Sequence, residues 1–180
     1  AIVTVEYEII PDAYPFPSSD TICNNGTTDI QLVRNLQATS FTWIAIPHPE
    51  ISGASDDATK TLYAINQTLQ NNSDTARSVL YIIAQYTYGC VFNPDTAIVW
   101  VEPTVVITAP GDTICDLGQT DIDISSMQVP TRAVYYTYTS APENAGAVTG
   151  NTSDATGQPI TVNIQDNLDN TTDQAQRVVY

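Results

Sequence analysis

The sequence is poor in basic residues. Five Lys or Arg residues stand against twenty Asp or Glu residues, Lys60 is the only lysine, and the formal net charge is −15 at pH 7. A chain this acidic repels phosphate backbones and anionic lipid head groups. We therefore expect no nucleic acid among its partners. The acidity indicates solubility at high local concentration, with binding of multivalent cations as the alternative.

The sequence also lacks long apolar runs and the common catalytic or metal-binding motifs. No run of about 18 apolar residues occurs, so we expect no membrane insertion in this segment. Neither CxxC nor a zinc-ligand spacing is present. The single histidine, His48, lies between two prolines, which does not suit the mobile imidazole of a catalytic triad. We expect no enzymatic activity.

The residues that are present favour β-strands. Hydrophobic residues make up 42% of the chain, and β-branched and aromatic types alternate with polar ones in residues 41–43, 79–83 and 98–101. Helical i, i+3, i+4 stripes are absent. Short alternating runs separated by Gly, Pro, Asn and Asp predict an all-β fold of immunoglobulin-like β-sandwiches.

An internal repeat sets the predicted domain organisation. Residues 20–30 (DTICNNGTTDI) match residues 112–122 (DTICDLGQTDI) at eight of eleven positions, and residues 69–81 match residues 168–180. Residues 1–6 (AIVTVE) resemble residues 97–102 (AIVWVE). We therefore predict the end of a preceding repeat at 1–15, a complete repeat at 16–107 and a second, C-terminally incomplete repeat at 108–180.

The junction between the two predicted repeats is bracketed by Pro103 and Pro110. Proline stiffens a short linker and removes backbone donors. The tandem repeats are therefore expected to form an extended, semi-rigid rod, with neighbouring repeats of the same chain as partners.

The internal repeat explains the odd number of cysteines. Cys115 is the counterpart of Cys23, and the counterpart of Cys90 would fall near position 189. We predict a Cys23–Cys90 disulfide, with Cys115 bonded to a cysteine beyond the chain end. Such a bridge would stabilise the fold by roughly 4 kcal/mol and indicates an oxidising compartment. The alternative is buried free thiols in a cytosolic protein.

The order of signatures along residues 22–101 resembles a known repeat. These signatures are Ile22-Cys-Asn-Asn-Gly26, Thr39-Ser-Phe-Thr-Trp43, Ile51-Ser-Gly-Ala-Ser55, Ile65-Asn-Gln-Thr-Leu69, Tyr88-Gly-Cys90 and Ala97-Ile-Val-Trp-Val101. Together they resemble the PKD-like repeat of giant Bacteroidota cell-surface proteins, including gliding-motility-type adhesins. The second repeat departs from the pattern at residues 134–138 (VYYTY), where the Phe-Thr-Trp signature is replaced.

The resemblance implies a non-catalytic repeat of a long secreted adhesin or filament that mediates surface attachment or gliding-type motility. It implies type IX secretion, an extracellular or bacterial cell-surface location, and surface glycans or other cell-surface proteins as partners. Two alternatives stay open. The chain could be a self-assembling extracellular filament subunit, or a spacer or binding module of a secreted enzyme.

The family resemblance also suggests modification sites. Asp-Thr followed by an apolar residue is similar to the O-glycosylation signal of exported Bacteroidota proteins, and it makes candidates of Thr21, Thr75, Thr96 and Thr113. The alternative is that Asp-Thr pairs simply serve as turn and strand-start residues.

Calcium is the one cofactor expectation. Oxygen ligands near domain junctions can lock modules together, and Asp56, Asp57, Glu102 and Asp112 are the nearest candidates for a structural Ca²⁺ site. The loop pattern Asp-x-Asp-x-Asp-Gly is absent. The aromatic residues Trp43, Tyr81, Tyr88 and Trp100 are predicted to pack in the core.

Overall fold

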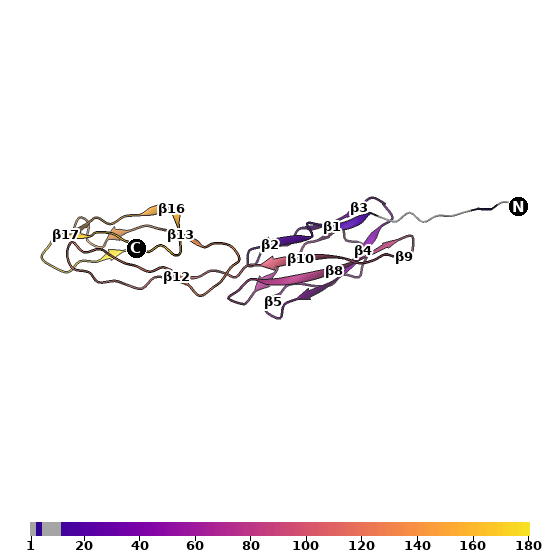
Figure 1. The fold of residues 1–180 in the computed structure, drawn as a ribbon, viewed down its shortest axis with the longest axis horizontal. Coiled ribbons are helices and arrows are strands. Elements are labelled where there is room, and N and C mark those ends of the chain that lie inside the picture. Colours follow the sequence, from indigo (N-terminus) through magenta and orange to yellow (C-terminus); the bar gives the residue numbers. More distant parts are fainter. Residues whose placement is uncertain (1–2, 5–11) are drawn as a thin grey trace. The chain divides into compact units, whose positions relative to one another are not determined.

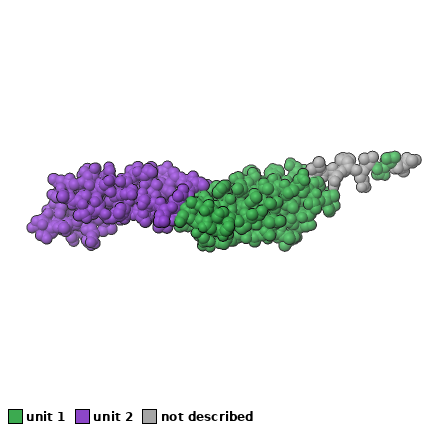
Figure 2. Space-filling view, turned by 60° about the horizontal axis from the view of Figure 1, so that its bottom comes forward, with its two compact units in different colours: residues 1–104 green, residues 105–180 purple. Residues whose placement is uncertain are grey.

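The computed structural model describes residues 3–4 and 12–180, in which every regular element is a β-strand. This confirms the predicted all-β class. The chain divides into unit 1, Ala1–Thr104, and unit 2, Val105–Tyr180 (Figure 2). The boundary lies three residues before the one predicted at 107. Most of the predicted tail at 1–15 lies outside the described residues.

The first sheet of unit 1 has three antiparallel strands in the order β1-β3-β6 (Figure 1). They are β1 (Ala13–Phe16), β3 (Ile30–Arg34) and β6 (Ala64–Ile65). Alternate side chains of β1 and β3 are buried, as the period of two in their sequences requires. Strand β1 crosses the boundary predicted between residues 15 and 16.

The second sheet has the order β2-β10-β8-β4, and β9 pairs with the end of β8. Here β2 is parallel to β10, while β8 is antiparallel to both β10 and β4. The strands are β2 (Ser19–Ile22), β4 (Ser40–Pro47), β8 (Arg77–Thr87), β9 (Cys90–Val91) and β10 (Asp95–Val101). The alternating runs predicted at 41–43, 79–83 and 98–101 lie in β4, β8 and β10.

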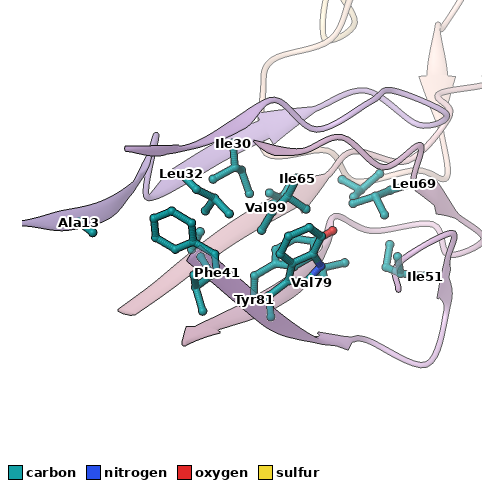
Figure 3. Close-up of a cluster of buried hydrophobic side chains, with 14 residues drawn as sticks. Ala13, Ile30, Leu32, Phe41, Ile51, Ile65, Leu69, Val79, Tyr81 and Val99 are labelled. Atoms are coloured by element: carbon teal, nitrogen blue, oxygen red, sulfur yellow. The ribbon is translucent and has the colours of Figure 1, made fainter. Parts of the chain in front are cut away.

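The core of unit 1 lies between these two sheets, so this unit is a β-sandwich (Figure 3). Its side chains come from the inner face of each sheet and from the two-stranded pair of β5 (Ile51–Ser52) and β7 (Gln70–Asn71). The buried members are Ala13, Ile30, Leu32, Phe41, Trp43, Ile51, Ile65, Leu69, Val79, Tyr81, Ile83, Ala97, Val99 and Val101.

Unit 2 consists of four antiparallel strand pairs, β11·β12, β13·β16, β14·β18 and β15·β17. Their bounds are β11 (Ile107–Thr108), β12 (Ser125–Ser126), β13 (Tyr135–Tyr138), β14 (Ala141–Pro142), β15 (Val148–Thr149), β16 (Asp154–Pro159), β17 (Asp169–Asn170) and β18 (Val178–Val179). A smaller core is formed by Ile122, Ile124, Tyr136 and Ile164, against which Tyr138, Ile160 and Tyr180 pack.

The turns that follow the two matching DTIC sequences have the same hydrogen bonds. The Gly26 N–H donates to the Cys23 carbonyl oxygen at 2.9 Å, and the Gly118 N–H donates to that of Cys115 at 2.9 Å. A Cβ on either glycine would lie within 2.8 Å of that oxygen. Glycine is therefore required at both turns by close backbone approach rather than by a positive φ.

Candidate functional site

The three cysteines are exposed, and no disulfide joins them in the structure. Cys23 follows β2 at the end of the sheet where Val101 pairs with Arg77, whereas Cys90 pairs with Thr87 at the other end of β8. Ten residues of β8 separate these levels, which is roughly 33 Å of strand. A disulfide needs Cα atoms about 4.4–6.8 Å apart.

The predicted Cys23–Cys90 bridge is therefore wrong for this fold. The prediction rested on the positions of Cys23 at the start and Cys90 near the end of the repeat. The hairpin of β8 and β9 instead carries Cys90 to one end of the sandwich, while the parallel pairing of β2 with β10 places Cys23 at the opposite end. The inferred partner of Cys115 lies outside the chain.

Three of the four Asp-Thr sequences share one local geometry. The backbone N–H groups of Thr21, Thr96 and Thr113 each donate to the carboxylate of the preceding aspartate at 2.7 Å. Thr96 and Thr113 are exposed, and Thr21 is half-buried. The hydroxyl oxygen of Thr75 is buried, so among the four candidates its side chain is the least accessible to a modifying enzyme.

The proposed calcium ligands already have local partners. Asp56 accepts the Ala45 N–H at 2.8 Å, and Asp57 accepts the Thr59 hydroxyl at 2.8 Å. Asp112 accepts two backbone N–H groups, one of them from Asp121 at 3.1 Å. The aspartate carboxylates thus serve as turn acceptors, the role that Asp commonly has in loops.

These carboxylates also lie apart within unit 1. Asp57 pairs with Trp43, level with Ile83 of β8, whereas Glu102 follows Val101, level with Arg77. Six residues of strand separate the two levels, roughly 20 Å. In residues 3–4 and 12–180, no three His, Cys, Asp or Glu side chains gather into a metal-binding group. Asp56 and Asp57 therefore do not share a calcium site with Glu102.

His48 lies in the loop between β4 and β5, as its flanking prolines predict. Its Nδ1 accepts the Glu50 N–H at 3.3 Å, and the Glu50 carboxylate bonds the Arg77 Nε at 3.2 Å. This is a loop-stabilising arrangement at the protein surface rather than a nucleophile and base held by a third group.

The predicted core position of the aromatic residues holds for only two of four. Trp43 and Tyr81 are buried, but Trp100 is 38% exposed and Tyr88, at positive φ in the hairpin of β8 and β9, is 81% exposed. The outward-facing side of β10 explains Trp100, since its neighbours Val99 and Val101 occupy the inward positions.

Trp100 belongs to an apolar outer face that the sequence analysis did not identify. On three adjacent strands several outward residues are apolar, and the pairing brings Ile44 opposite Ile82, Ile46 opposite Leu80, and Leu80 opposite Ile98. Ile44 and Ile46 are each at least half exposed. The signal was present in the sequence, because positions on both faces of β4, β8 and β10 are apolar.

A cavity of about 560 Å³ lies between residues 111–115 and residues 176–180, and Asn170 also lines it. No strand in the described part of unit 2 pairs with residues 111–114. Their counterparts in unit 1 form β2, which pairs with β10. We refer to this cavity as the strand slot.

Comparison with protein families identifies the fold of unit 1. Residues 20–105 match the PKD-like domain family. This match supports a PKD-like, immunoglobulin-like β-sandwich, in agreement with the two packed sheets. A search of curated proteins finds no match.

The PKD-like match also bears on the general kind of function. Domains of this family are generally non-catalytic, structural and extracellular. Among the residues that the structure describes, no helix is long and apolar enough to cross a bilayer.

Tyr81 is a titratable group in the core of unit 1. Its side chain is buried, its hydroxyl donates to Gln67 Oε1 at 2.9 Å, and burial raises the pKa of Tyr81 from 10.0 to about 12. The unfolded chain loses this proton near pH 10, before the folded one does. The contribution to stability is therefore full below pH 10 and is lost as the pH rises to 12.

We expect the free energy of unfolding of unit 1 to fall by about 1–2 kcal/mol between pH 10 and pH 12 because of Tyr81. Both tryptophans, Trp43 and Trp100, lie in unit 1, so urea unfolding followed by tryptophan fluorescence measures this unit alone. The free energy of unfolding of the Tyr81→Phe variant should depend less on pH over this window. If the free energy of unfolding depends on pH equally in wild type and variant, Tyr81 is not the cause of the pH dependence.

Proposed function

We propose that the chain is a non-catalytic structural segment of a long secreted adhesin or filament, exported to a bacterial cell surface, where it mediates surface attachment or gliding-type motility. Its role is mechanical: it carries tension between a surface anchor and a binding region elsewhere. The PKD-like match and the acidic, soluble composition support this proposal.

The observation that carries the proposal is the pairing of β2 with β10, which are the first and the last strand of the second sheet along the chain. Strand β2 comes early in unit 1 and β10 comes last, yet they lie side by side and parallel, in register from Ile98↔Ser19 to Val101↔Ile22 (Figure 1). Hydrogen bonds from Ile98 N to Ser18 O and from Glu102 N to Ile22 O, at 3.0 and 2.9 Å, close the two ends of this ladder.

This arrangement resists extension. Tension on the two ends of unit 1 pulls β2 and β10 in opposite directions along their length. All hydrogen bonds of a parallel ladder are then loaded together, whereas strands pulled sideways lose their bonds one after another. A module that transmits force benefits from this shear geometry, and a module selected only for a binding site has no need of it.

Single-molecule force spectroscopy tests the proposal. In the ladder, alternate N–H groups of β2 point toward β10, so Asp20→Pro removes one donor, while Ser19→Pro changes a residue whose N–H points away. We expect Asp20→Pro to lower the unfolding force clearly and Ser19→Pro to change it little. In each case the contour length should increase by roughly 28 nm per unfolding event.

Two outcomes contradict the mechanical role. If wild-type unit 1 extends without a distinct force peak, its strands do not carry tension. If the two proline variants lower the force equally, the β2–β10 ladder is not the element that resists. Because the contour length reports complete unfolding in each trace, a variant that fails to fold is recognised by the missing event.

The finer parts of the proposal concern modification and contact. We propose O-glycans at the exposed Thr96 and Thr113, with half-buried Thr21 a weaker candidate. The apolar outer face around Ile44, Ile46 and Trp100 is the surface that we propose to contact glycans or other cell-surface proteins. Calcium binding stays a prediction, and Asp112 is the candidate ligand in unit 2.

A self-assembling filament subunit is the second candidate function. The strand slot of unit 2 favours it, because an open edge beside a cavity can accept a strand from another molecule. A spacer or binding module of a secreted enzyme has no specific structural observation in its favour.

A further inference from the structure

Trp100 lies in a setting that suits a sugar ring. It is 38% exposed on the apolar outer face, while its strand neighbours Val99 and Val101 fill the core. Directly opposite residues of paired strands project to the same face of a sheet. Trp100 is opposite Thr21 of β2 on one side and opposite Ser78 of β8 on the other. The indole is therefore flanked by a hydroxyl side chain on each side.

An indole between hydroxyl groups matches the two kinds of surface that a pyranose ring presents. The face of a pyranose with equatorial hydroxyls carries C–H groups, whose partial positive charge is attracted to the negative face of an aromatic ring. The hydroxyls at the rim of the same sugar donate and accept hydrogen bonds, as Ser and Thr hydroxyls do. Trp100 thus supplies a stacking surface, and Thr21 and Ser78 supply polar partners one strand spacing away, at about 4.8 Å.

The charge of the face selects among saccharides. No Asp, Glu, Lys or Arg occupies an outward position of β2, β4, β8 or β10, and every polar residue at these positions carries a hydroxyl group. The chain as a whole has a net charge of −15, which repels anionic polysaccharides. Lys60 covers the Tyr86 ring at 3.7 Å, but Tyr86 lies eight residues along β8 from Ser78. Around Trp100 the face therefore fits an uncharged sugar.

The size of the apolar patch favours a small ligand over a protein. Its members on β10, β8 and β4 are Trp100, Ile98, Leu80, Ile82, Ile44 and Ile46. They cover three strands and about four residues of strand length, an area on the order of 250 Å². A stable protein interface, including one between two copies of this chain, buries about 800 Å² on each partner. The patch is therefore too small to hold a protein by itself, and its size suits a short oligosaccharide.

We propose that the apolar outer face of unit 1 binds a neutral saccharide, with a pyranose ring stacked on Trp100 and its hydroxyls bonded to Thr21 and Ser78. The apolar residues toward Ile44 and Ile46 extend the contact to adjoining rings. The saccharide belongs to the surface to which the chain attaches. This inference therefore rests on the proposed role in attachment, and it names the chemistry of the contact.

Affinity electrophoresis of the unglycosylated 180-residue chain tests the proposal, because an acidic chain migrates readily in native gels. The gels contain hydroxyethylcellulose, laminarin or galactomannan as neutral polysaccharides, or alginate as an acidic one. We expect retardation by at least one neutral polysaccharide and none by alginate. Trp100→Ala should weaken the binding at least about tenfold, and Ser78→Ala about threefold. Both side chains lie outside the core, so the variants should keep the cooperative urea unfolding that Trp43 reports.

Tyr88→Ala is the matched control, because it removes an aromatic side chain that is 81% exposed but lies in the hairpin of β8 and β9. It should leave the binding within about twofold of wild type. Three gel results overturn the proposal: no retardation by any of the neutral polysaccharides, equal retardation by alginate, or equal effects of Trp100→Ala and Tyr88→Ala.

Sedimentation velocity adds a fourth outcome that would overturn the proposal. A concentration-dependent dimer that Trp100→Ala abolishes would make a second copy of the chain the occupant of the face. We expect no such dimer, because the patch is too small for one. The unfolding force of unit 1 does not depend on these results, so the mechanical role can stand or fall separately.

Discussion

Replacing Gly53 with alanine should destabilise unit 1 by at least about 3 kcal/mol. Gly53 has φ of +93°, where a side chain is strained, and a Cβ built there would lie 2.0 Å from the Thr68 carbonyl oxygen. The added methyl group must push the 51–53 segment away from the chain leading into β7. Urea unfolding followed by tryptophan fluorescence gives the loss in the free energy of unfolding.

Gly89 provides the matched control for this substitution. Its φ of +84° is similar, but nothing lies within 4 Å of an added Cβ. Gly89→Ala should therefore cost only the backbone strain, about 1 kcal/mol. Equal costs for Gly53→Ala and Gly89→Ala would show that the loop moves freely and that the close approach to Thr68 is not a constraint.

The same constraint occurs in unit 2. Gly150 has φ of +89°, and a Cβ there would lie 2.0 Å from the Asn167 carbonyl oxygen. The matched Ser-Gly and Thr-Gly sequences thus hold the same loop geometry in both units. Ile51-Ser-Gly53 and Val148-Thr-Gly150 are similar in sequence, while the reason for glycine became clear only from the distance.

Replacing Thr28 with valine should destabilise unit 1 by about 2–3 kcal/mol, although the two side chains have nearly the same shape. Thr28 is buried, and its hydroxyl donates to the Ile65 carbonyl oxygen at 2.7 Å and accepts the Gln67 N–H at 2.9 Å. Valine leaves both backbone groups without these bonds in a place that water does not reach. The same urea titration measures the effect.

Thr27→Val makes the same chemical change at the neighbouring position. Thr27 is exposed and its hydroxyl bonds only that of Thr68, at 2.9 Å, so its loss should cost less than about 0.5 kcal/mol. In unit 2, Thr120 bonds Ile164 O and Asp166 N at 3.1 and 2.8 Å in the same way. A small effect of Thr28→Val would mean that the loop relaxes to satisfy these groups elsewhere.

The strands of unit 1 could be predicted because each depends on local sequence. Residues such as Phe41, Val79 and Val99 alternate with residues on the outer face, and alternation with a period of two is a property of a single strand. Turn residues such as Gly26 could be predicted for a similar reason, since the hydrogen bond that they require lies within four residues.

The candidate sites could be predicted only in part. Thr96, at the start of β10, and Thr113 are exposed, but the hydroxyl oxygen of Thr75 is buried. The apolar outer face escaped prediction because Ile44 and Ile82 read equally well as core residues. Which face of a strand meets the other sheet is a property of the packing, not of the strand.

By itself, the sequence determined the all-β class, the alternation of the main strands, the counterparts between the two halves and the acidic, basic-poor surface. The tertiary structure alone decided that Cys23 and Cys90 lie at opposite ends of a sandwich and that β2 and β10 form a parallel ladder. The physical reason is strand order. In β2-β10-β8-β4 the neighbours come from distant parts of the chain, and local residue patterns carry no information about which distant strand supplies the next ladder.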